Sequence, residues 1–192
     1  MSKKLSSPLM QKNGEKYLFT FIISFIIFAV MVIPLLIYTK GYLIYYGDYN
    51  SQQIPFYMHA HDVIRSGEFM WDWGTDLGTN FLGSYSFYLF GSPFFWLTIP
   101  FPREIVPFLM APLLCLKYAL ASTTAYAYIR KFVRNKNLAV VGGLLYAFSG
   151  FQAYNIFFNH FHDVTAFFPL LLLAVEERIN NNRRGVFALT VA

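Results

Sequence analysis

Long apolar stretches determine what this chain can fold into. They cover residues 18–38, 106–129 and 138–158, with a shorter one at 164–177. A transmembrane helix needs about 20 predominantly apolar residues to cross a hydrocarbon core about 30 Å thick. Only 13% of the residues are charged and the mean hydropathy is +0.43, which no ordinary soluble domain matches. We therefore expect an all-α, polytopic membrane protein with an outer loop at 40–105.

Basic residues suggest how the spans are oriented, because Lys and Arg collect in cytoplasmic loops. They form clusters before the first span, between the second and third spans, and after the fourth: Lys3, Lys4, Lys12 and Lys16; Arg130, Lys131, Arg134 and Lys136; Arg178, Arg183 and Arg184. This distribution predicts a cell-membrane protein with a cytoplasmic amino terminus. It also explains the net charge of +5 without nucleic acid and suits anionic lipid headgroups. Residues 185–192 resemble the start of a further span, so we expect the N-terminal part of a larger protein.

Residues 81–100 are apolar enough to be taken for another span. If they crossed the membrane, the basic cluster at 130–136 would face outward, against the charge rule. We therefore expect a re-entrant or interfacial element that is broken at Gly91 and Pro93.

A short amphipathic helix is predicted in the outer loop. Ser51 is a candidate N-cap, Pro55 is tolerated in a first turn and Gly67 is a typical stop. Apolar residues and one histidine recur on one stripe at helical spacing, which favours a helix lying along the membrane interface. The stripe comprises Ile54, Tyr57, Met58, His61 and Ile64.

Asp48 is the leading catalytic candidate. It follows the first span by about ten residues and is flanked by Gly47 and Tyr49. A carboxylate near the membrane surface could accept a proton from an acceptor hydroxyl. The alternative is a turn or cap aspartate. Asp72 and Asp76 lie beside glycines, and for them we favour the structural interpretation.

Two H-x-H-D sequences raise the question of a metal site. On a helix, His59 and His61 would point to opposite sides, so only His59 and Asp62 could act together. The second sequence supplies His160, His162 and Asp163, a donor set that suits a divalent cation such as Mg²⁺ or Mn²⁺ beside phosphates. Histidines hydrogen-bonded to loop backbone are the alternative. Cys115 is the only cysteine, so neither a disulfide nor a cysteine metal site can form within this sequence.

Several other residues are candidates for substrate binding. Lys117 stands in the middle of the second span, where a charge is costly and is by default a functional candidate; it could hold a phosphate or pair with an acid. Trp71 and Trp73 could stack on sugars, although aromatic residues also form interfacial belts. Gln53 is a further candidate in the outer loop.

The motifs GDYNSQQIPF, GEFMWDWGTDLGTNF, YLFGSPFFWL and NHFHD begin at residues 47, 67, 88 and 159. Together they resemble the N-terminal region of bacterial YfhO-type membrane proteins. This resemblance implies a C-type glycosyltransferase that uses a polyprenyl-phosphate sugar outside the membrane. It implies that Asp48 is the first-loop catalytic acid and that Asp163 is a second acidic position near the donor.

The implied acceptor is a cell-wall glycopolymer such as teichoic acid. Two other functions stay open: a transporter or flippase of lipid-linked sugars, and a structural membrane assembly subunit.

Overall fold

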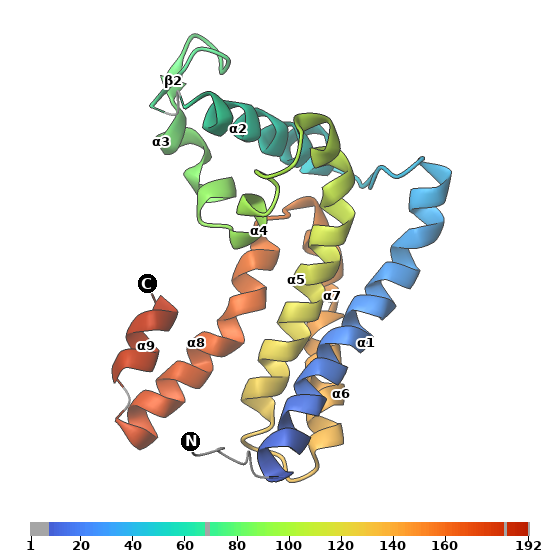
Figure 1. The fold of residues 1–192 in the computed structure, drawn as a ribbon, viewed down its shortest axis with the longest axis vertical. Coiled ribbons are helices and arrows are strands. Elements are labelled where there is room, and N and C mark those ends of the chain that lie inside the picture. Colours follow the sequence, from blue (N-terminus) through green and yellow to red (C-terminus); the bar gives the residue numbers. More distant parts are fainter. Residues whose placement is uncertain (1–7, 68–69, 183, 192) are drawn as a thin grey trace, which may run out of the picture. The chain divides into compact units, whose positions relative to one another are not determined.

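The computed structural model describes residues 8–67, 70–182 and 184–191, with side chains from residue 14 to residue 190 of these ranges (Figure 1). Lys3, Lys4 and Arg183 of the basic clusters lie outside the described residues, as does Ala192. The described chain is helical apart from one two-stranded ladder. Its contacts divide it into two compact units. The first comprises Met1–Phe28, Tyr118–Ser149 and Thr165–Ala192; the second comprises Ala29–Lys117 and Gly150–Val164.

Two long apolar helices confirm the helical expectation. They are α1 (Pro8–Tyr38) and α5 (Val106–Ile129). Within the described residues, Gly14–Tyr38 and Arg103–Ile129 are the two helical segments that are long and apolar enough to cross a membrane. Both coincide with predicted spans. The number of crossings and the cytoplasmic amino terminus stay predictions.

The expected continuous helix at 138–158 is wrong. The structure has α6 (Lys136–Ala147), then α7 (Gly150–Tyr154) and the 3₁₀ turn η4 (Asn155–Phe157). The break falls at Phe148 and Ser149, directly before Gly150, and a serine-glycine pair is a common cause of helix breaks. Because the apolar composition continues through this turn, the sequence predicted one helix where the structure has two.

The fourth apolar stretch lies in a longer helix than expected. α8 (Phe161–Asn181) has 21 residues, compared with the predicted 164–177. It begins with Asp163 in its first turn and has Arg178 in its last, an arrangement that complements the helix dipole. At 1.5 Å per residue, α8 is about 32 Å long. The following helix, α9 (Arg184–Val191), lies within the last apolar segment.

The first unit is held together by close packing of α1, α5 and α6. Gly143 of α6 lies so near α5 that an added Cβ would stand 2.5 Å from the Ser122 carbonyl oxygen. Tyr126 packs with Ala139 and Val140 in a buried cluster. Small residues allow membrane helices to approach in this way.

The second unit contains the broken element expected at 81–100. It consists of α3 (Phe81–Tyr85), the π-helical turn η2 (Ser86–Phe90) and α4 (Pro93–Trp96). The break between the last two lies at Gly91 and Ser92. The Ser92 hydroxyl caps α4 by accepting a hydrogen bond from the Phe95 amide at 3.2 Å. The predicted interruption is confirmed, whereas its position in the membrane stays a prediction.

The predicted outer helix is α2 (Ile54–Ser66). Pro55 is in its first turn, and Gly67 ends it with a φ of +79°, as expected. Ser51 as its N-cap is wrong, because Ser51 lies inside a π-helical turn, η1 (Tyr49–Gln53), that runs directly into α2. Tyr57 and His61 of the stripe are buried, and the Tyr57 ring packs edge-on against Phe95 at 5.3 Å. Other parts of the protein therefore cover this face of α2.

The remaining elements are β1 (Trp71–Asp72), β2 (Thr79–Asn80) and η3 (Arg103–Ile105).

Candidate functional site

The side chain of Asp48 is exposed to solvent. The residue occupies the N-cap position of η1, with φ −75° and ψ −2°, yet its side chain accepts no capping hydrogen bond. The capping role considered from the sequence is therefore not observed. The carboxylate is therefore accessible from solvent.

The loop carrying Asp48 is fastened to α7. The Tyr45 hydroxyl donates to the Ala153 carbonyl at 2.9 Å, and the Tyr46 hydroxyl donates to the Tyr154 carbonyl at 3.2 Å. Gly47 has a φ of +63°, and an added Cβ would stand 3.3 Å from the Phe157 ring. These contacts hold the residues that precede Asp48 in one position.

Lys117 lies at the centre of a buried polar network. Its ammonium group is 2.7 Å from Asp163 Oδ1. It also donates to the carbonyl oxygen of Asn159 at 2.9 Å and to the side-chain oxygen of Asn159 at 3.0 Å. One ion pair and two hydrogen bonds therefore engage this ammonium group. A phosphate would have to displace one of these partners to bind Lys117 directly.

The network extends to α2 through Asn159. The Asn159 amide donates to the Tyr57 hydroxyl at 3.2 Å. Burial raises the pKa of Tyr57, and this effect exceeds the opposing one of the nearby Lys117 charge. Tyr57 is therefore a neutral hydroxyl at physiological pH. Neither Asn159 nor this hydroxyl was identified from the sequence, although the asparagine directly precedes the H-x-H-D motif.

Gln53, the last residue of η1, contacts His160. The Gln53 side-chain oxygen is 3.4 Å from His160 Nδ1, and both residues are buried. The His160 ring also packs against Tyr88 and Phe161, with centroids 4.7 and 4.6 Å away. Burial and the Lys117 charge lower the pKa of His160 to about 4. His160 is therefore a neutral hydrogen-bonding group at pH 7.

The proposed metal ligands have other partners. Asp163 is paired with Lys117, His160 faces Gln53, and His162 hydrogen-bonds to the backbone of Asn155. Among the residues that the structure describes, no three His, Cys, Asp or Glu side chains converge as a metal site would require. The sequence-based metal site stays a prediction.

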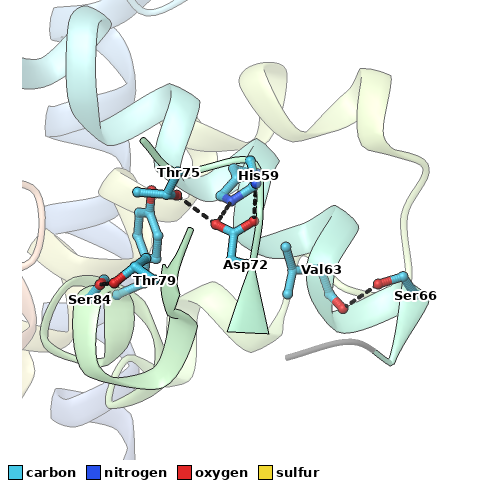
Figure 2. A network of polar contacts seen from close by, with 9 residues as sticks. His59, Val63, Ser66, Asp72, Thr75, Thr79 and Ser84 are labelled. Atoms are coloured by element: carbon cyan, nitrogen blue, oxygen red, sulfur yellow. Dashed lines mark hydrogen bonds and ion pairs between the residues drawn. The ribbon is translucent and has the colours of Figure 1, made fainter. Parts of the chain in front are cut away.

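His59 and Asp62, the two residues of the first motif that could act together, have separate partners in the structure. His59 Nε2 lies 2.5 Å from Asp72 Oδ2 (Figure 2), whereas Asp62 Oδ2 is 2.5 Å from Arg103 Nε. The β1–β2 hairpin brings Asp72 against α2, a contact that spacing along one helix could not indicate. Asp72 also accepts from the Gly74 amide at 2.8 Å and from the Thr75 hydroxyl at 2.6 Å.

These contacts make Asp72 a structural residue, as the sequence favoured. Burial raises the pKa of Asp72, but the hydrogen bonds from Thr75, His59 and Gly74 lower it by more, so the pKa lies below its usual value. Asp76 is exposed in the turn between the strands and has a φ of +49°. Both observations fit a turn residue.

Trp71 and Trp73 flank Asp72 and are exposed. Their exposed fractions are 49% and 77%, and their rings form an edge-on pair with centroids 5.7 Å apart. Gly78, with a φ of +102°, lies under both rings, and an added Cβ would be 2.9 Å from an atom of each. The network around Asp72 therefore supports a hairpin that carries two exposed aromatic rings.

The comparisons with known proteins give one match. The sequence matches the family described as bacterial membrane protein YfhO over residues 20–192. No curated protein and no solved structure matches. The match covers the first-span region, the Asp48 loop, the hairpin and the Lys117 network. This chain therefore belongs to the YfhO family of bacterial membrane proteins.

Proposed function

We propose that this protein is a membrane glycosyltransferase that moves a sugar from a polyprenyl-phosphate-linked donor to an extracytoplasmic cell-wall polymer such as teichoic acid. The observation that carries the proposal is the exposed, uncapped carboxylate of Asp48 on a loop fastened to α7. A general base must be both accessible and positioned, and Asp48 combines the two.

In the proposed reaction, Asp48 accepts the proton of an acceptor hydroxyl. The acceptor oxygen forms a bond to the anomeric carbon of the donor sugar, and the bond from that carbon to the phosphate oxygen breaks. Polyprenyl phosphate leaves with the electron pair. The carboxylate is restored when the proton passes to solvent.

Binding roles are proposed for further residues of the second unit. Trp71 and Trp73 would stack on a sugar face, because their rings are exposed on a supported hairpin. Gln53 and neutral His160, buried against each other, would act by joining η1 to the segment at 159–163. Lys117 and Asp163 would act indirectly, by fixing the turn at 159–163 that carries His160.

A matched pair of variants tests the proposal. Membranes containing wild type, Asp48→Asn or Asp76→Asn receive a panel of undecaprenyl-phosphate hexoses, and label transferred to polymer is measured. Asp48→Asn should lower transfer about 10²- to 10⁴-fold, the usual contribution of a general base. Asp76→Asn removes a similar exposed charge and should transfer normally. Transfer by Asp48→Asn at the wild-type rate would refute the catalytic assignment.

A transporter or flippase of lipid-linked sugars is the second candidate. The break between α6 and α7 and the buried Lys117–Asp163 pair support it, because transporters use broken helices and intramembrane charges. Such a protein needs no base at position 48. It would move the lipid-linked sugar across vesicle membranes equally well with Asp48→Asn.

A further inference from the structure

A groove on the first unit is lined by α1 and α6. Its volume is about 380 Å³. Most of the lining is apolar; Val140 belongs to the buried cluster of the first unit, and Leu144 packs against that cluster. The apolar lining residues are Phe19, Ile23, Val140, Val141 and Leu144. An acyl chain fits this lining because it needs no hydrogen-bonding partner.

A cationic group is part of the same groove. Lys16 lines it, and its ammonium group donates to the side-chain oxygen of Asn137 at 2.8 Å. The same group lies 5.6 Å from the centroid of the Phe19 ring. The contact with Asn137 occupies one of three donors of the ammonium group. Lys16 is thus held beside the apolar lining with capacity for an anion.

Two further basic residues lie beside the neighbours of Lys16: Arg130 beside Tyr17, and Lys136 next to Asn137. Arg130 lies over the ring of Tyr17, 5.0 Å from its centroid, and Lys136 donates to the Arg130 carbonyl at 2.6 Å. Glu15 is the acidic residue adjacent to Lys16 on α1. An anion beside Lys16 would therefore experience a net positive field.

We infer that this groove is a binding site for one anionic phospholipid, with an acyl chain against Ile23 and Val141 and the headgroup phosphate at Lys16. The charge complementarity between the phosphate and the basic end of the groove selects this occupant over a wholly apolar partner. Basic pockets between membrane helices bind anionic lipid headgroups in this way. The inference does not depend on the proposed glycosyltransferase activity.

Lipid binding to the purified protein in detergent tests the inference. Native mass spectrometry would count bound dioleoyl-phosphatidylglycerol and dioleoyl-phosphatidylcholine across a titration. We expect one tightly held phosphatidylglycerol and a preference over phosphatidylcholine of about fivefold, as one lysine at a membrane surface contributes. Lys16→Gln should remove this preference. Arg134→Gln removes a charge from the basic cluster at 130–136, outside the groove lining, and should keep it.

A second pair of variants tests the apolar part. Val141→Trp would fill the groove from an exposed position and should weaken binding of both lipids at least fivefold. Leu145→Trp lies one turn further along α6, outside the groove lining, and should bind both normally. Size-exclusion chromatography would check that each variant is folded.

Three results would overturn the inference. One is a wild-type protein with no headgroup preference. Another is an equal loss of the preference for phosphatidylglycerol in Lys16→Gln and Arg134→Gln. That result would indicate a general attraction of the basic residues for anionic lipid, without a specific site. The third is unchanged lipid binding by Val141→Trp together with a changed oligomeric state, which would show that protein covers the groove.

Discussion

Lys117 of α5 and Asp163 of α8 form an ion pair of 2.7 Å in which the lysine side chain is fully buried and the aspartate is 13% exposed. Charges withdrawn from water are stable only when they are compensated. Here the compensation comes from two segments of the second unit, the end of its α5 portion and the turn at 159–163. The pair therefore fixes that turn.

Removing only one member of this pair should destabilise the protein. Lys117→Met leaves a largely buried carboxylate without its cation, which costs about 3–5 kcal/mol. The midpoint of thermal unfolding in detergent should fall accordingly. Lys117→Met combined with Asp163→Leu should recover much of the loss, since the unpaired charge is gone. An unchanged midpoint for the single variant would mean that the pair does not hold the turn.

Gly78→Ala should destabilise the hairpin, whereas Gly91→Ala should not. Position 78 has a φ of +102° and tryptophan ring atoms 2.9 Å from an added Cβ. Alanine at such a backbone conformation costs more than the roughly 0.4–1 kcal/mol gained at a compatible site. Gly91 has a φ of −73° and no atom within 4 Å of an added Cβ. Limited proteolysis should detect faster cleavage near the hairpin in Gly78→Ala only; equal cleavage rates would contradict the packing.

The tryptophan pair should report the ionisation of Asp72. Because hydrogen bonds lower the pKa of Asp72 in the folded protein, its contribution to stability is complete above the unfolded value of 3.8. That contribution is lost as the pH falls through the lower, folded value. In a Trp96→Phe background, fluorescence of Trp71 and Trp73 should be steady from pH 7 to pH 5 and change below pH 3.8. In Asp72→Asn the emission should already be altered at pH 7. A spectrum of Asp72→Asn that matches wild type would show that the Asp72 carboxylate does not hold the tryptophan pair in place.

Cysteine labelling in cells should establish the membrane topology. With Cys115 replaced by serine, Thr79→Cys and Glu104→Cys should both react with a membrane-impermeant reagent from outside, because residues 81–100 are expected not to cross. Arg134→Cys should react only after permeabilisation. Reaction of Glu104→Cys solely from the cytoplasmic side would reverse the assignment.

Local signals in the sequence predicted part of this structure. Pro55 and Gly67 predicted the two ends of α2. Proline suits the first turn of a helix, and glycine readily adopts the left-handed conformation that ends one. The apolar stretches predicted α1 and α5, but could not place the turn at Ser149, since apolar composition continues through it. Partners distant in sequence were not predictable: His59 lies against Asp72 across a hairpin, and Lys117 meets Asn159 through folding of the chain. Asp48 was identified from the sequence by its place after a span. Only the structure could show that its side chain accepts no capping hydrogen bond.

The two hydrogen bonds that hold the Asp48 loop to α7 depend on the amino-acid type of the donor residues more than on that of the acceptor residues. Tyr45 and Tyr46 contribute side-chain hydroxyls, but their acceptors are the main-chain carbonyls of Ala153 and Tyr154. Replacing the side chain at either acceptor position leaves its carbonyl in place, whereas a tyrosine-to-phenylalanine change removes a donor outright. Purifying selection on this contact would therefore fall on the two tyrosines. Residue 153 could change without a compensating substitution at Tyr45, so covariation between these two positions would not reveal that they touch.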